Sequence, residues 1–247
     1  MKALSSGPSL GVRLLGGVSA GGVLAGGASR GGAARVERAP SGSVGRKAVA
    51  ALSGVLLAGW SVLHLIGISS AYAGAAVMER YAGWLRQGAG VPLWGMRLVL
   101  GAVFALHLWL VLGLWARARR ARPIGYAGAS PSRGMAGGLR WASLLLLAGI
   151  VGHVLHFSFG AGLPGFDHRH VYSNLLGAFR AWGVTLLYLG FAALFGFHLA
   201  HGLFAAPVSV GAAWRERRRR VLGWTLAIGV AAAFAALPLA VQLGVLR

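Results

Sequence analysis

Long apolar stretches alternate with short basic segments along this chain of 247 residues. A helix needs about 20 consecutive, mostly apolar residues to cross a bilayer, and five windows reach that length. The pattern therefore predicts an all-α integral membrane bundle. Its five transmembrane helices are expected over 48–72, 95–115, 141–162, 181–205 and 222–245.

The composition agrees with a membrane protein. Hydrophobic residues make up 57% of the chain, only 11% of residues are charged, and the mean hydropathy is +0.69. The chain contains no cysteine. This excludes disulfides, iron–sulfur ligation by this chain, thiolate-ligated haem and covalent haem attachment through a CxxCH motif.

Positive charge is concentrated in the segments between alternate spans. The net charge is +20, from 24 Lys and Arg against 4 Asp and Glu, and the segments 1–47, 116–140 and 206–221 carry 7, 6 and 5 of these basic residues. This placement indicates that the basic residues contact lipid headgroups and set the orientation of the protein in the membrane, rather than bind nucleic acid. Because basic loops stay inside, we expect a cytoplasmic N-terminus and an external C-terminus.

Residues 1–45 are rich in Gly, Ala, Ser and Arg and predict a disordered or loosely ordered basic tail before a five-helix domain over 46–247. A weakly apolar stretch, Val12 to Gly27, leaves a secretory signal as an alternative. The basic run Arg217–Arg220 near the last inner loop is interpreted as a topology signal facing lipid, with docking of an acidic partner as the alternative.

Four histidines lie one in each of the first four predicted spans: His64, His107, His153 and His198. An ionisable side chain in hydrocarbon is costly and needs a partner, so each is a functional hypothesis. Imidazole ligates iron, and histidines on facing helices can hold a haem in a bundle core. The alternative for each is a hydrogen-bonded structural histidine.

The expected depths arrange these histidines in two layers. With a rise of about 1.5 Å per residue, His64 and His153 lie roughly 24 and 18 Å from the inner face, and His107 and His198 roughly 12 and 10 Å. Each pair comes from two parallel helices that can face each other diagonally across a four-helix bundle. The layers predict two stacked b-type haems, an outer one on His64 and His153 and an inner one on His107 and His198.

Other residues leave alternatives open. His156 and His201 each follow a candidate ligand by three residues and share its helix face, so either is an alternative ligand. His168 and His170 lie in the outer loop "FDHRH", as solvated residues or as a surface metal site. Glycines near the ligands allow a cofactor to approach or helices to pack closely; they are Gly67, Gly101, Gly149, Gly152 and Gly196.

The predicted spans contain no Asp or Glu. This argues against a carboxylate-based proton pump or cation transporter.

The chain resembles a known family, the dihaem cytochrome b558-type membrane anchor subunits of succinate:quinone oxidoreductases (succinate dehydrogenase and fumarate reductase). The resemblance covers roughly 46–211 and rests on "SGVLLAGWSVLHLIG", "MRLVLGAVFALHLWLVLGLWARARRARPIGYA", "GIVGHVLHFSFG" and "GFHLAHGLF". Family spacing selects His153 rather than His156 and His198 rather than His201. The second segment also carries the family's ARP-x-x-Y element at Ala121, Arg122, Pro123 and Tyr126.

The chain departs from the family at two positions. The family often has Asn where this chain has Ile68, and some fumarate reductases have Glu, implicated in proton transfer, where this chain has Gly196. The second departure puts that proton route in doubt.

The resemblance implies a role in respiration in the bacterial cytoplasmic membrane. A flavoprotein subunit and an iron–sulfur subunit would bind on the cytoplasmic side, and electrons would pass to the inner haem, the outer haem and then a quinone, by analogy menaquinone. The chain would be a subunit of the enzyme without flavin-site catalysis of its own. Arg97, Arg140 and Arg180 are candidates for pairing with haem propionates or for interfacial anchoring. The candidates for a quinone pocket near the outer face are Tyr172, Asn174 and Glu79.

Two other functions are kept as alternatives. One is a dihaem cytochrome b subunit of another respiratory dehydrogenase, of the hydrogenase or formate dehydrogenase type. The other is a haem-free membrane transporter or assembly protein with structural histidines. The ARP-x-x-Y element and the lack of histidine in the fifth span favour the succinate enzyme.

Overall fold

Five long helices account for the five predicted spans. The computed structural model describes residues 41–87, 90–121, 131–212 and 215–247, and within these ranges all regular structure is helical. The five helices are each long and apolar enough to cross a membrane, which confirms five candidate spans. They are α1 (Ser41–Ser69), α3 (Val91–Arg120), α4 (Pro131–Phe159), α6 (Trp182–Ser209) and α7 (Glu216–Gln242).

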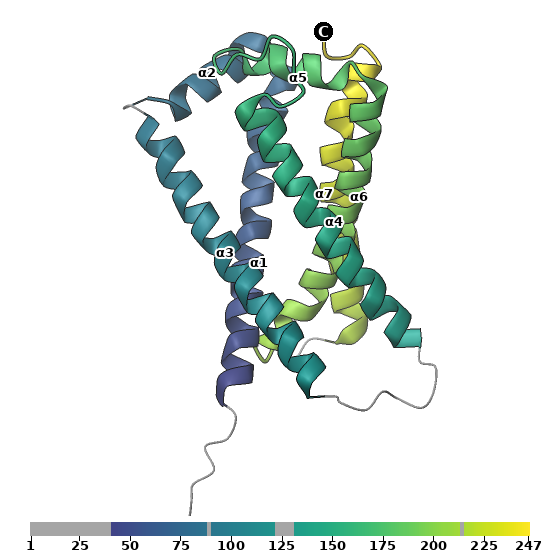
Figure 1. Ribbon diagram of the computed structural model, residues 1–247. Coiled ribbons are helices and arrows are strands. Elements are labelled where there is room, and N and C mark those ends of the chain that lie inside the picture. The colour runs from purple at the N-terminus through teal and green to yellow at the C-terminus, as the bar shows by residue number, and fades with distance from the viewer. Residues whose placement is uncertain (1–40, 88–89, 122–130, 213–214) are drawn as a thin grey trace, which may run out of the picture. The chain divides into compact units, whose positions relative to one another are not determined.

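Two short helices that the hydrophobic pattern did not predict lie between the long ones. A 3₁₀ turn, η1 (Ser70–Ala73), extends α1 and is followed by α2 (Ala75–Leu85), while α5 (Val171–Phe179) precedes α6. Gly74 separates η1 from α2 with φ of 96°, a left-handed conformation that favours glycine. Figure 1 shows α2 and α5 across the end of the bundle opposite the start of α1. We call this the α2/α5 end.

The opposite end carries most of the positive charge and is called the basic end. There α1 begins, α3 ends, α4 begins, α6 ends and α7 begins. Of the tail predicted over 1–45, residues 41–45 form the start of α1 and residues 1–40 lie outside the described residues. In the ARP-x-x-Y element, Ala121 follows α3, whereas Arg122, Pro123 and Tyr126 lie outside the described residues.

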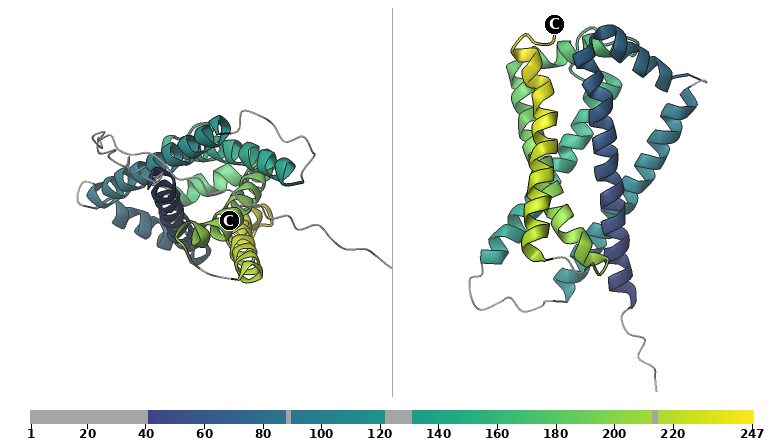
Figure 2. Two further views of the ribbon diagram at one scale, coloured as in Figure 1. Left: turned by 90° about the horizontal axis from the view of Figure 1, so that it is seen from below. Right: turned by 180° about the vertical axis from the view of Figure 1, so that it is seen from behind.

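The long helices pack as an open ring rather than as a solid bundle. Close contacts join α3 to α1, α1 to α6 and α6 to α4, and α7 packs along α6. The right-hand view of Figure 2 shows α6 and α7 side by side. The contacts give the order α3, α1, α6, α4, and the ring is open between α3 and α4. In this order α1/α4 and α3/α6 are the diagonals, and neither pair is among the closely packed ones. Side chains from diagonal helices therefore face each other across its middle.

The first six α-helices repeat one plan. A long helix, a short helix at the α2/α5 end and a second long helix occur in the order α1, α2, α3 and again in the order α4, α5, α6. Because each half crosses and returns, α1 runs parallel to α4 and α3 runs parallel to α6. The parallel helices of the two halves are the diagonal partners of the ring.

The main cluster of buried apolar side chains lies at the α2/α5 end. It joins residues of η1, α2, α5 and α7, among them Ala71, Met78, Leu175, Phe179 and Leu237. Elsewhere most large apolar side chains of the spans are exposed, which suits helices that face lipid rather than water.

Two polar clamps hold α5 in place. The half-buried Glu79 of α2 accepts hydrogen bonds from the backbone N–H groups of Val171 (3.2 Å) and Tyr172 (2.9 Å) at the start of α5. These N–H groups have no partner within the helix, and the carboxylate also suits the positive end of the helix dipole. At the other end of α5, Gln242 of α7 donates to the carbonyl of Phe179 (2.7 Å) and to Thr185 Oγ1 (3.1 Å).

Candidate functional site

The outer candidate ligands meet across a diagonal of the ring. The imidazole centroids of His64 on α1 and His153 on α4 are 5.8 Å apart, with the ring planes at 78° to each other. Both side chains are half-buried. Since α1 and α4 do not pack closely, the two rings approach each other across the space between their helices. The Nδ1 atom of His153 is buried and has no hydrogen-bond partner among the described residues.

Aromatic side chains surround this pair. Trp60 and Phe234 lie beside the ring of His64, with centroids 6.4 and 6.3 Å away. Phe157, Tyr188 and Phe191 lie 5.5, 5.9 and 6.3 Å from the centroid of His153. The outer pair therefore sits in an apolar, aromatic environment with few polar groups to compete for its ring nitrogens.

Of the inner pair, His107 on α3 is held through one ring nitrogen by α1. Its Nδ1 lies 3.0 Å from Ser53 Oγ and 3.2 Å from the carbonyl of Ala50. The Ser53 hydroxyl itself donates to the Ala50 carbonyl at 3.0 Å. Both groups can therefore accept from an Nδ1–H, which leaves the Nε2 lone pair free. Metal-ligating histidines typically have this arrangement, with one nitrogen on the metal and the other donating to the protein.

His198 on α6 is held in the same way by α4. Ser143 donates to the carbonyl of Leu139 at 2.8 Å, so its oxygen is free to accept from His198 Nδ1–H at 3.2 Å. In the tautomer that donates from Nδ1, the Nε2 of His198 is again free to ligate. Each inner candidate ligand thus has a serine from the neighbouring helix of its own half.

The two pairs lie at different levels of the bundle. On α1, Ser53 precedes His64 by 11 residues, and on α4, Ser143 precedes His153 by 10 residues. At 1.5 Å per residue these intervals correspond to about 15 to 17 Å along the helix axis. The structure thus brings the rings of His64 and His153 together. His107 and His198 lie nearer the basic end, each held by a serine, and their two rings are not in contact with each other.

The outer pair has the spacing that a bis-imidazole haem requires. A metal–imidazole bond measures about 2 Å, so two rings that share one metal have centroids roughly 6 Å apart. The 5.8 Å between His64 and His153 agrees with this spacing. The unpartnered His153 Nδ1 and the serine-held His107 and His198 are further features of a ligand set rather than of a sealed apolar core.

Glycines allow close approach at several of these positions. A Cβ on Gly54 would lie 3.1 Å from His107 Cε1, so α1 approaches this ring closely only because residue 54 is glycine. Gly67, Gly149 and Gly196 make room for Tyr81, for Phe191 and for Ala231 of α7, which is helix packing. Gly101 and Gly152 have open space at the Cβ position.

The alternative histidines are placed less favourably. His156 Nδ1 is 3.0 Å from the hydroxyl of Tyr188, and His201 is exposed. His168 is also exposed, and His170 pairs with Asp167 at 2.8 Å. Among the residues that the structure describes, no three His, Asp or Glu side chains form a group suited to a metal ion.

The arginine candidates lie near span ends. Arg97 stacks on Trp94 at 5.0 Å and Arg140 on Trp115 at 5.7 Å. Arg180 is exposed and lines a cavity of about 530 Å³ at the α2/α5 end. These positions are typical of interfacial anchors, and their pairing with haem propionates stays a prediction.

The quinone-pocket candidates all take part in local hydrogen bonds. Glu79 clamps α5, and Tyr172 donates to the carbonyl of Arg247 at 3.2 Å. Asn174 lines the same cavity as Arg180. It also accepts from the N–H of Asp167 and donates to its carbonyl.

Asp167 carries a further network of its own. Its carboxylate accepts from the N–H of Arg169 (2.8 Å) and lies 2.8 Å from His170 Nδ1. The Arg169 N–H and then His170 hold the pKa of Asp167 below its ordinary value. The loop is therefore ordered around an ionised carboxylate.

The chain matches no known family model, no curated protein and no solved structure in the comparisons made. Any function is therefore inferred from the residues and their geometry.

Sequence reasoning missed Ser53, Ser143 and Gly54. A signal for the serines was available. Both lie within apolar helices, and the two precede the outer histidines by nearly equal intervals. Gly54 became recognisable only through its contact with a helix distant in the sequence.

Proposed function

We propose that the chain is a dihaem cytochrome b that serves as the membrane anchor of a succinate:quinone oxidoreductase. The observation that carries the proposal is the contact between the rings of His64 and His153, which come from diagonal helices. His64 and His153 would hold one haem, and His107 and His198 the other. When bound, a b-type haem supplies a one-electron carrier.

The residues of the chain would perform the binding and orientation. Ser53 and Ser143 would fix the tautomer and ring orientation of the inner ligands by accepting the Nδ1 proton. The aromatic side chains around His64 and His153 exclude water from the outer pair. No carboxylate of the described chain lies within the middle of a span, so proton uptake by quinone would occur near an end of the bundle.

The choice of the succinate enzyme over another dihaem dehydrogenase rests on the resemblance. The ARP-x-x-Y element and a fifth span without histidine support it. Flavoprotein and iron–sulfur subunits would bind at the basic end, which we propose faces the bacterial cytoplasm, and menaquinone would be the acceptor.

An optical and a biochemical experiment together test the proposal. The full chain, purified after expression with haem supply, is expected to show a reduced-minus-oxidised b-type spectrum and two haems per chain. Absence of a b-type band would overturn the haem assignment. Copurification of a flavin-containing partner with succinate-dependent quinone reduction is expected from the native membrane. Association with a hydrogenase or formate dehydrogenase instead would retain the haems and overturn the succinate assignment.

A further inference from the structure

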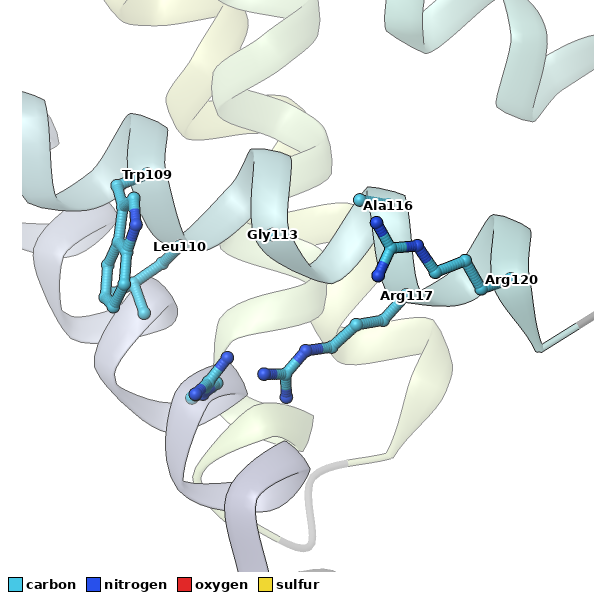
Figure 3. Close-up of a pocket in the computed structure, with 7 residues that line it drawn as sticks. Trp109, Leu110, Gly113, Ala116, Arg117 and Arg120 are labelled. Atoms are coloured by element: carbon cyan, nitrogen blue, oxygen red, sulfur yellow. The ribbon is translucent and has the colours of Figure 1, made fainter.

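A cavity at the basic end is not explained by the proposed ligand set. It has a volume of about 220 Å³ and lies against α3 and the first turns of α1. Three arginines line it: Arg46 from α1, and Arg117 and Arg120 from α3. Figure 3 shows Arg117 extended from α3 towards α1. A guanidinium nitrogen of Arg117 comes within 4.0 Å of the position that a Cβ on Gly42 would take.

No acidic side chain of the described residues lines this cavity. The described residues include three acids, Glu79, Asp167 and Glu216. Glu79 and Asp167 are engaged at the opposite end of the bundle, and Glu216 pairs with Arg220 at 2.8 Å. Three guanidinium groups that share one small cavity repel one another unless an anion lies between them. The charge pattern therefore indicates an anion from outside the described protein.

The other walls of the cavity indicate what kind of anion this is. Trp109 stacks with Arg46 at 6.0 Å, and the buried Leu110 and the neighbouring Gly113 provide an apolar side. The arginines lie at the ends of two candidate spans, where lipid headgroups are found. Basic pockets between transmembrane helices bind anionic headgroups, and guanidinium matches phosphate geometry in a bidentate way. A soluble anion would need the arginines but would gain nothing from the apolar side.

We propose that this cavity is a binding site for an anionic phospholipid, with the headgroup phosphate among Arg46, Arg117 and Arg120 and the start of the acyl region against Leu110 and Gly113. The proposal does not depend on the haem assignment. It gives a reason for the open space at Gly113, where a Cβ would meet nothing within 4 Å.

Native mass spectrometry of the delipidated full chain tests the site. Phosphatidylglycerol and phosphatidylcholine with the same acyl chains are titrated separately. We expect one phosphatidylglycerol to bind in preference, and about a fivefold loss of affinity for each of R46Q, R117Q and R120Q, the factor for one arginine near a charged membrane surface. The matched control is R119Q, because Arg119 lies on the same helix turn but stacks on Trp115 at 5.3 Å outside the cavity.

A second variant tests the cavity without changing charge. In G113L the added side chain enters open space, so the helix should fold while the lipid is excluded. G229L is its control, since Gly229 of α7 also has open space at its Cβ. Equal losses in R119Q and R117Q, or unchanged binding in G113L, would overturn the site in favour of general surface charge.

Two further arms exclude other anions. If inorganic phosphate at the same concentration displaces the lipid fully, the site is one for a free anion and the lipid proposal fails. If phosphatidylglycerol binds only after H107A removes the inner haem, the cavity belongs to the carboxylates of that haem, and the lipid proposal also fails. Preferential binding in both wild type and H107A supports it, whether or not the haem assignment holds.

Discussion

The hydroxyl of Ser53 on α1 lies 3.0 Å from Nδ1 of His107 on α3, although 54 residues separate them along the chain. The contact fixes which ring nitrogen of His107 carries the proton and which is free to ligate. Ser143 makes the equivalent contact with His198 at 3.2 Å. The orientation of both inner histidines is therefore set by contacts within the protein.

Removal of either serine hydroxyl should weaken the inner haem site. We expect S53A and S143A to lower haem affinity at that site by about 10- to 100-fold, the usual effect of losing a partner of a metal-ligating histidine. Haem titration followed by optical spectroscopy measures this. The control is S61A, because Ser61 donates only within α1, to Leu57 at 2.9 Å. An equal loss in S61A would mean that the serines act through helix stability alone.

Single replacements of the four candidate ligands should separate the two sites. H64A and H153A are each expected to remove the outer haem, and H107A and H198A the inner one, because each pair shares one iron. The haem-to-chain ratio should fall from two to one. H156A is the control, since His156 is bonded to Tyr188 and should leave both haems. Retention of both haems in H153A with loss in H156A would reverse the ligand assignment on α4.

A side chain at residue 54 should damage only the inner site. In G54L the Cβ would come within 3.1 Å of His107 Cε1, so the imidazole must move and its alignment with His198 is lost. We expect one haem per chain, with the outer spectrum unchanged. G59L on the same helix, where a Cβ meets nothing within 4 Å, should retain two haems. Two retained haems in G54L would contradict this geometry.

The clamp from Gln242 should contribute to stability without affecting haem binding. Q242L removes the hydrogen bonds to the Phe179 carbonyl and Thr185 and should lower the free energy of unfolding by about 1 to 3 kcal/mol. Thermal unfolding in detergent measures the change. Gln87 is the other glutamine of the chain and is exposed, so Q87L should leave the unfolding midpoint nearly unchanged.

The loop around Asp167 should weaken in acid. The pKa of Asp167 is lower in the folded protein than its ordinary value near 3.9. Its contribution to stability is therefore complete above about pH 4 and is lost as the pH falls through the lowered value. The difference in unfolding midpoint between wild type and D167N should be constant from pH 8 to about pH 5 and shrink below about pH 4. A constant difference at all pH values would mean that the carboxylate does not remain ionised in the loop.

Periodicity and length alone predicted the spans, because the apolar windows containing His64, His107, His153 and His198 are long and bounded by arginines. The same pattern missed α2 and α5. These helices are short, and their buried side chains, such as Met78 and Leu175, become recognisable only when packed against other segments. Apolar windows therefore identify transmembrane helices well, but they identify short helices at the ends of the bundle poorly.

The ligand candidates could be named from the sequence, but their supports could not. The position of each histidine within its span predicts its depth in the membrane. The direction in which each span runs then sorts the four histidines into two levels. Ser53, Gly54 and Ser143 act between helices, and a contact such as Ser53–His107 depends on the relative rotation of α1 and α3. The rotation of one helix relative to another cannot be derived from a single sequence.

The repeated plan of the two halves has a consequence for assembly. In the proposed holoprotein every iron takes one imidazole from the half formed by α1 and α3 and one from the half formed by α4 and α6. Neither half could complete a site alone, and each haem would link the two halves at their interface. Maturation would then be ordered, because both hairpins must insert before the first cofactor is retained. In the apoprotein the halves would be joined by protein contacts alone, such as the packing of α1 on α6.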